Sequence, residues 1–164
     1  MRINLRVWLK IPDAEAATVK NTLTRRLGFQ NKILDVKKER LFIIDIDNGD
    51  PIDLAESFAK ELVNENKESF IASNQDLHFE HGCVPVKVSL HIEDGEAIST
   101  RDRLRNRLGF EGVRDLRRAT IWKLYIKGNN QHQIAKQIAE SLLINPHKDS
   151  YEIMDTNPQI SKEV

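Results

Sequence analysis

The residues with the greatest capacity for chemistry lie close together between positions 78 and 83. They are His78, Glu80, His81 and Cys83. Imidazole, carboxylate and thiolate are ligands for Zn²⁺, and the two histidines would share a face on a helix. No CxxC pair is present, however, and further ligands would have to come from elsewhere in the chain. A lone cysteine beside Gly82 at the start of a strand is more typical of an inert thiol than of a nucleophile, so a structural joint is favoured over a metal or catalytic site.

A second candidate is a concentration of arginines in the second half of the chain. Such a group could contact phosphate or RNA. The alternating spacing of the first four spreads them over two helix faces, and three carboxylates lie nearby. A solvated face with weak ion pairs is therefore favoured, followed by a protein-binding patch and then by nucleic acid. The arginines are Arg101, Arg103, Arg105, Arg107, Arg114, Arg117 and Arg118, with Asp102, Glu111 and Asp115 as their acidic neighbours.

Signatures of catalysis are missing from the rest of the sequence. It contains no Walker A sequence, GxGxxG, nucleophile elbow or HExxH, which nucleotide-binding, hydrolytic and zinc-dependent enzymes commonly carry. Caps and turns explain the carboxylates that recur in both halves, Glu15, Asp35, Asp94 and Asp115. We therefore predict no catalytic, cofactor-binding or metal-binding residue and no cofactor.

The elements that must position these residues occur twice. Residues 3–29 align with 84–110 without a gap, and Arg26-Leu27-Gly28-Phe29 matches Arg107-Leu108-Gly109-Phe110. The repeating unit has the size of a small domain, about 80 residues, which is too long for a solenoid repeat. The sequence therefore predicts two copies of one domain in tandem.

The boundaries follow from this alignment. We expect a first repeat at residues 1–73, a joint at 74–83, a second repeat at 84–154 and a loose polar tail at 155–164. Leu77 and Phe79 alternate with polar residues, so the joint is itself a candidate strand. Because each repeat is small for a core of its own, we expect the halves to pack on each other as a pseudo-dimer.

Each repeat begins with a strand followed by a helix. Apolar residues alternate with polar ones over 2–11 and 84–92, which indicates strands with one buried face. Asp13 and Asp94 are candidate N-caps, and Gly28 and Gly109 lie where a left-handed residue would end each helix.

A hairpin and a second helix complete the prediction. In the first repeat, 32–37 and 41–47 flank a charged turn at Lys38-Glu39-Arg40, and Asp50-Pro51 begins a helix. A short strand ends each repeat. The expected fold is thus α+β, with two β-α-β-β-α-β repeats, mainly antiparallel sheets and helices on one face.

The opposite face of the predicted sheets carries mixed residues, which suit either contact between the halves or docking of another protein. They are Trp8, Lys10, Asp45, Ser89, His91 and Tyr125.

The bulk composition limits the setting of the protein. The 164 residues include 25 basic and 25 acidic side chains, so the chain has no net charge to attract nucleic acid or an anionic membrane. No window approaches the length of a membrane helix, about 20 apolar residues. With a single cysteine and no signal-peptide pattern, the expectation is a cytoplasmic protein without membrane contact.

The second half resembles PurS, the small subunit of phosphoribosylformylglycinamidine synthase. Its closing helix ends in Leu-Leu-x-Asn-Pro before a Tyr-x-Ile strand, and its middle resembles the family's Leu-Gly helix end and Val-x-x-Val-Arg segment. The first half is similar more weakly, since Asn64-Glu65-Asn66 replaces the Asn-Pro element. The matching residues are Leu108, Gly109, Val113, Leu116, Arg117, Leu142, Leu143, Asn145, Pro146, Tyr151 and Ile153.

The resemblance implies a role in purine synthesis. PurS pairs bridge an ATP-dependent large subunit and a glutaminase subunit, and PurS has no active site of its own. Two fused copies would supply such a pair, and further self-association is open. Alternatives are an α+β binding module that has drifted from PurS, as a small-molecule sensor or RNA-binding adaptor, and a metal-dependent enzyme using residues 78–83. The partner contacts that we predict are Arg114, Arg117, Arg118, Asn145, Pro146 and Tyr151.

Overall fold

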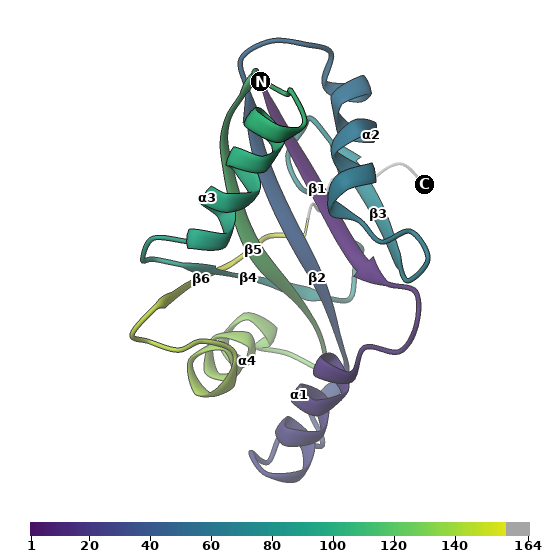
Figure 1. The fold of residues 1–164 in the computed structure, drawn as a ribbon. Helices are drawn as coiled ribbons and strands as arrows, with labels where there is room; N and C mark the ends of the chain where they lie inside the picture. Colours follow the sequence, from purple (N-terminus) through teal and green to yellow (C-terminus); the bar gives the residue numbers. More distant parts are fainter. Residues whose placement is uncertain (157–164) are drawn as a thin grey trace. The chain divides into compact units, whose positions relative to one another are not determined.

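A computed structural model describes residues 1–156 (Figure 1). The chain divides into two compact units that are intermixed in sequence. Unit 1 contains Met1–Ile11, Glu39–Leu77 and Ile92–Thr120, and unit 2 contains Pro12–Lys38, His78–His91 and the described residues from Ile121 to Thr156. The predicted tail lies outside the described residues except for Asp155 and Thr156, which are in neither a helix nor a strand.

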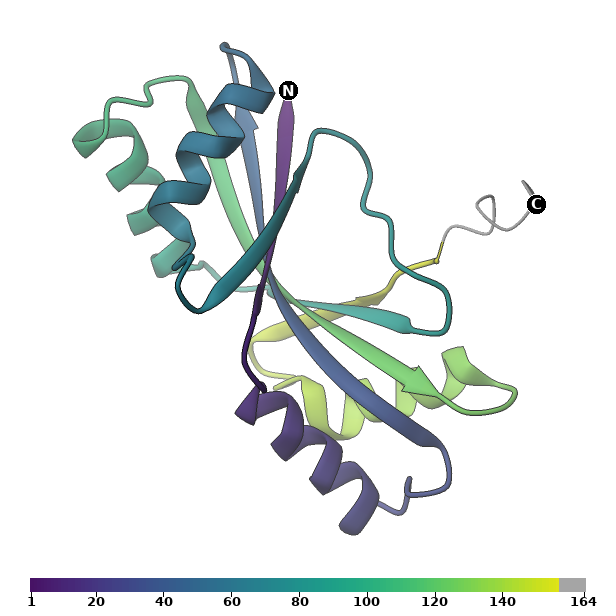
Figure 2. The same ribbon diagram turned by 90° about the vertical axis from the view of Figure 1, so that its right-hand side faces the viewer.

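Unit 1 is a four-stranded antiparallel sheet with helices on one face. Its strand order is β3 (Glu68–Ser73), β1 (Arg2–Leu9), the second part of β2 (Ile33–Ile46) and the first part of β5 (Val113–Ile126). Leu5 on β1 lies opposite Phe42 on one side and Ala72 on the other. Both views place α2 (Pro51–Leu62) and α3 (Gly95–Asp102) on the same face (Figures 1 and 2). Helix α3 continues as a π-helical turn, η1 (Arg103–Arg107).

Unit 2 repeats this plan with the remaining elements. Its strand order is the first part of β2, the second part of β5, β4 (Val84–Leu90) and β6 (Asp149–Ile153). Its helices are α1 (Ala14–Arg25) and α4 (Gln131–Ile138), and α4 continues as η2 (Ala139–Leu143).

Each hydrophobic core takes a helix from the opposite half of the sequence. In unit 1, Ala97 and Leu104 from α3 and η1 pack with Leu5 and Phe58. In unit 2, Ala16 and Leu23 from α1 pack with strand and helix residues of the second half. Neither half of the sequence therefore contains all the apolar side chains of one core. The compact units cut across the two predicted repeats, and the repeats themselves stay a prediction about the sequence.

The predicted hairpins are wrong. Lys38-Glu39-Arg40 lies within β2, which runs unbroken for 14 residues, and β5 is a continuous strand of the same length. Glu39 is only 4% exposed, and Arg6 donates hydrogen bonds to its two carboxylate oxygens at 2.7 and 2.9 Å. The positive charge of Arg6 compensates the negative charge of the buried Glu39 carboxylate. The strand can therefore continue through the three charged residues without a turn.

The joint is not a strand either, since residues 74–83 form a loop that links β3 to β4. Phe79 is nevertheless buried. The mixed α+β class, the antiparallel strands and the helix ends are confirmed. Asp13 and Asp94 cap α1 and α3, and Gly28 and Gly109 both have φ of +77°.

Candidate functional site

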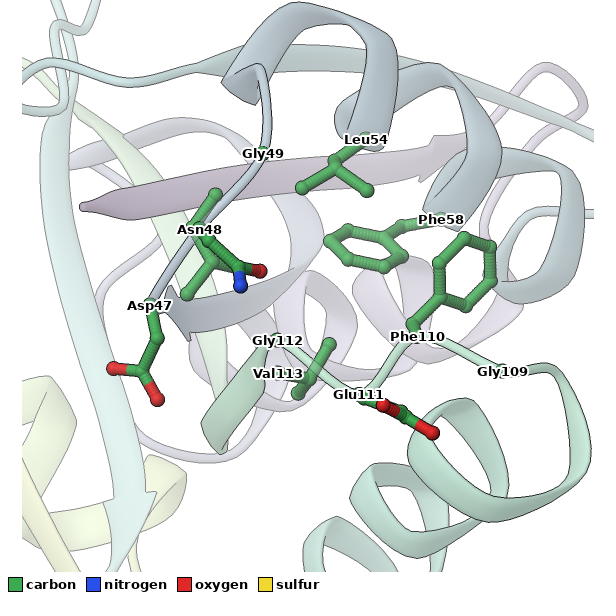
Figure 3. Close-up of a pocket in the computed structure, with 11 residues that line it drawn as sticks. Asp47, Asn48, Gly49, Leu54, Phe58, Gly109, Phe110, Glu111, Gly112 and Val113 are labelled. Atoms are coloured by element: carbon green, nitrogen blue, oxygen red, sulfur yellow. The ribbon is translucent and has the colours of Figure 1, made fainter.

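A pocket of about 480 Å³ opens in unit 1 where two loops meet (Figure 3). One loop follows β2 at Asp47 and leads to the cap of α2. The other links η1 to β5 and ends at Gly112. The backbone N–H of Asp47 donates to the carbonyl oxygen of Gly112 at 2.8 Å, which holds the loops together.

The pocket has an apolar wall and a polar mouth. Phe58 and Phe110 pack edge to face with centroids 5.1 Å apart, and Leu54 lies beside them. Asp47, Asn48 and Glu111 also line it (Figure 3). None of the lining residues is a histidine, cysteine, serine or lysine. The pocket therefore offers an apolar wall and two carboxylates, those of Asp47 and Glu111, as possible contacts for a ligand.

Two of the predicted contact arginines lie at the β2–β5 side of unit 1 as exposed ion-pair partners. Arg114 lies 3.3 Å from Asp47, and Arg117 lies 3.6 Å from Asp45. Arg2 also donates to Asp45, at 2.8 Å. The hydrogen bond from Arg2 lowers the pKa of Asp45, with additional lowering by the charges of the nearby arginines. Arg114 and Arg117 remain about half exposed or more and so accessible to a partner.

Arg118 is engaged more fully. Its guanidinium donates to both carboxylate oxygens of Asp94, at 2.9 and 3.1 Å, and contacts Glu96 at 2.7 Å. Burial alone would lower the pKa of Arg118, but these two carboxylates raise it above its ordinary value. Because Asp94 also caps α3, this arginine fastens the helix to β5.

The other three predicted contact residues belong to unit 2. The backbone N–H of Asn145 donates to Asp149 at 2.8 Å, and its side-chain oxygen accepts the N–H of His147 at 3.0 Å. Pro146 lies within this turn. The hydroxyl of Tyr151 donates to Glu140 at 2.7 Å, and this hydrogen bond raises the pKa of Tyr151. The six predicted residues are thus divided between the two units, three in each.

An equivalent turn occurs in unit 1. The N–H of Asn64 donates to Glu68 at 2.9 Å, and the side-chain oxygen of Asn64 accepts the N–H of Asn66 at 3.2 Å. The turn at Asn64 therefore has the same hydrogen bonds as the turn at Asn145 but no proline. The asparagine at its first position and the carboxylate four residues later were the signal for it in the sequence.

Sequence reasoning missed a polar network in unit 2 that joins the loop 74–83 to β5. One carboxylate oxygen of Glu80 accepts from Tyr125 at 2.5 Å and from Lys123 at 3.0 Å. Burial tends to raise the pKa of Glu80, but these hydrogen bonds and the lysine charge bring it down to about 2. Burial and the bond to Glu80 raise the pKa of Tyr125.

This network changes the interpretation of residues 78–83. Glu80 binds side chains of β5, and the buried Cys83 donates to the carbonyl oxygen of Glu80 at 3.4 Å. Residues 1–156 contain no group of three or more candidate ligands that could hold a metal ion. The hydrogen bonds of Glu80 connect the loop to β5.

Comparison with known proteins adds one finding. Residues 83–156 match the family model PurS, described as phosphoribosylformylglycinamidine (FGAM) synthase. The PurS match spans β4 to β6 and contains all six predicted contact residues, whereas residues 1–82 lie outside it. No curated protein matches the chain. Within the described residues, no helix is long and apolar enough to cross a membrane.

Proposed function

We propose that this chain is a non-catalytic subunit of phosphoribosylformylglycinamidine synthase in the cytoplasm, bridging the ATP-dependent large subunit and the glutaminase subunit. The observation that carries the proposal is the match of residues 83–156 to PurS. A PurS-like half that keeps the closing Asn-Pro turn and the exposed arginines retains surface for partners.

The architecture supports the role of a fused pair. The core of unit 1 includes α3 from the second half of the sequence, and the core of unit 2 includes α1 from the first half. Such an exchange is expected if two PurS-like halves complete each other within one chain. A short link keeps such halves at an effective concentration of about millimolar, so the pair persists when the subunit itself is dilute.

The described side chains also fit a role in binding rather than in chemistry. The titratable groups with shifted pKa values serve ion pairs and hydrogen bonds within each unit, as Asp94 with Arg118 and Glu80 with Tyr125 do. The large subunit would perform the ATP-dependent step and the glutaminase would release ammonia.

Reconstitution of the three proteins tests the proposal. We expect glutamine-dependent turnover to fall strongly when this chain is omitted, while turnover with added ammonia changes little. Equal glutamine-dependent turnover with and without the chain would contradict the role.

A matched pair of variants locates the contact. The double change Arg114→Ala and Arg117→Ala should weaken co-purification with the partners, because both guanidinium groups are about half exposed or more. The double change Arg105→Ala and Arg107→Ala is the control, since both are exposed arginines of the same unit and neither is among the predicted contacts. Equal loss in both variants would indicate a general charge effect.

One observation favours the alternative of a drifted small-molecule sensor, namely the pocket between Asp47 and Glu111. Leu54→Trp would fill the pocket from α2 without touching the exposed arginines. If that change abolished glutamine-dependent turnover while the complex still assembled, the result would favour a small-molecule sensor over a bridging subunit.

A further inference from the structure

The outer edge of unit 1 carries a second recess. β3 is the terminal strand of its sheet, and β1 occupies only one of its two sides. A groove of about 340 Å³ lies between the second half of β3 and the first turns of α2. An edge strand of this kind leaves alternate backbone N–H and C=O groups free to pair with another strand.

The groove is lined mainly by apolar side chains. The buried Ile3 lines it from β1, and Phe70 and Ala72 line it from β3. Ile52 and Ala55 line it from α2, and Ile52 is 72% exposed. Such a groove takes an aliphatic side chain from a neighbouring strand, because every second side chain of that strand points to the same face.

One carboxylate, that of Glu56, lines the groove. Two further exposed carboxylates belong to sequence neighbours of lining residues, because Asp53 follows Ile52 and Asp76 follows Gln75. We call these three carboxylates the acidic rim. Among residues 1–156 none of these three carboxylates forms an ion pair. The whole stretch 50–76 contains seven acidic residues and two lysines, so a basic partner would meet little repulsion there.

We propose that this edge binds an extended basic segment of another protein as an added strand beside β3. An aliphatic residue of the segment enters the groove, and lysine or arginine two positions before and after it pairs with the acidic rim. Backbone pairing supplies affinity and the groove supplies selectivity. The binding of such a segment is independent of the proposed bridging role. Only the identity of the protein that carries the segment rests on that role.

A second copy of this chain fits the edge poorly. The other terminal strand, β6, carries Asp149 and Glu152, and β3 carries Glu68. Neither terminal strand carries a lysine or arginine that could pair with the acidic rim. The remaining strands already have a neighbour on each side.

Fluorescence anisotropy with labelled peptides tests the inference on the full chain alone. The probe is an extended peptide that alternates valine with serine and bears lysine two positions before and after its central valine. Its control has glutamate in place of lysine. We expect saturable binding of the lysine peptide, weakened at high salt, and no binding of the glutamate peptide. N-methylation of alternate backbone nitrogens should abolish binding, because it removes strand pairing but keeps the charge.

Variants of the chain locate the site. Glu56→Lys should weaken binding by about tenfold, since attraction is replaced by repulsion. Ala72→Leu should weaken it similarly by filling the groove with an apolar side chain. Glu93→Lys is the matched control, because Glu93 is an exposed carboxylate of unit 1 that does not line the groove.

The opposite results overturn the inference. They are no saturable binding of the lysine peptide, equal binding of both peptides, or equal affinity in Glu56→Lys and the parent chain. Self-association that Ala72→Leu abolishes would show a second copy at this edge instead. The peptide assay uses this chain alone, whereas the bridging role is tested with all three proteins. Failure of the peptide inference can therefore be distinguished from failure of the bridging role.

Discussion

Glu80 shows how one side chain can define a local structure. Its carboxylate accepts hydrogen bonds from Tyr125 and Lys123 and thereby ties the loop 74–83 to β5. We predict that Glu80→Gln destabilises the chain by about 1 kcal/mol at pH 7, a value kept small because half of the side chain is exposed and screened. Urea unfolding measures the difference.

The pH dependence of that difference is a sharper test. The pKa of Glu80 falls from 4.5 to about 2 on folding, so its stabilising effect is complete above the unfolded value and is lost as the pH falls through the folded one. The gap between the parent chain and Glu80→Gln should therefore narrow between pH 4.5 and 2. A gap that stays constant over this range would contradict the network.

Gly112 is required by a close approach rather than by its backbone angles. A Cβ atom there would lie 2.3 Å from Oδ1 of Asn48 and 3.2 Å from its carbonyl oxygen. Gly112→Ala should cost about 1–3 kcal/mol through this overlap. Asn48→Gly removes the nearer of the two contacts, so the double variant should regain most of the loss. Additive costs in thermal unfolding would show that the residues do not meet.

At the scale of elements, the caps of the first helix in each half can be compared directly. Asp13 caps α1 by hydrogen bonds alone, whereas Asp94 caps α3 and also pairs with Arg118. Asp13→Ala should cost about 1 kcal/mol, and Asp94→Ala about 2–3 kcal/mol. The control Asp94→Asn keeps a capping oxygen and should fall between them; equal costs for Asp13→Ala and Asp94→Ala would rule out a contribution from Arg118.

Amide exchange tests the unbroken strand β2. The amides of Lys38, Glu39 and Arg40 lie in the middle of the strand, so they should exchange as slowly as their neighbours in the strand. A hairpin turn at this place would instead give fast exchange at these residues, with protection on both sides.

The sequence could predict where helices begin and end, because Asp13, Asp94, Gly28 and Gly109 carry local signals. It could not predict that β2 continues through three charged residues. The residue that neutralises Glu39 is Arg6, which is 33 positions away. The 14-residue strand is also much longer than the usual five or six residues, so a turn was the natural expectation.

In the candidate site, too, local features could be predicted from the sequence and contacts between distant residues could not. Exposure of Arg114 and Arg117 agrees with their polar surroundings in the sequence. The engagement of Arg118 by Asp94 and the Glu80 network join residues 24 to 45 positions apart. No local pattern encodes such pairs, whereas the turn at Asn145 is encoded by its neighbours.

At the scale of the molecule, each hydrophobic core contains side chains from both halves of the sequence. The repeated sequence pattern did not predict this exchange of helices. The first half supplies α1 to unit 2, and the second half supplies α3 to unit 1. Burial of Leu23 and Leu104, each fully inside its core, contributes about 2–3 kcal/mol apiece by transfer from water. A separated half would lose this contribution and expose the matching apolar face.

The dependence of each core on both halves is tested most directly by dividing the chain within the joint, at Leu77 and His78. Fragments 1–77 and 78–164 should form a 1:1 complex with cooperative unfolding when they are produced together. Either fragment alone should be unfolded or associate with its own copy, as sedimentation and denaturant titration would show. A single fragment that remains a monomer and unfolds cooperatively would contradict the account.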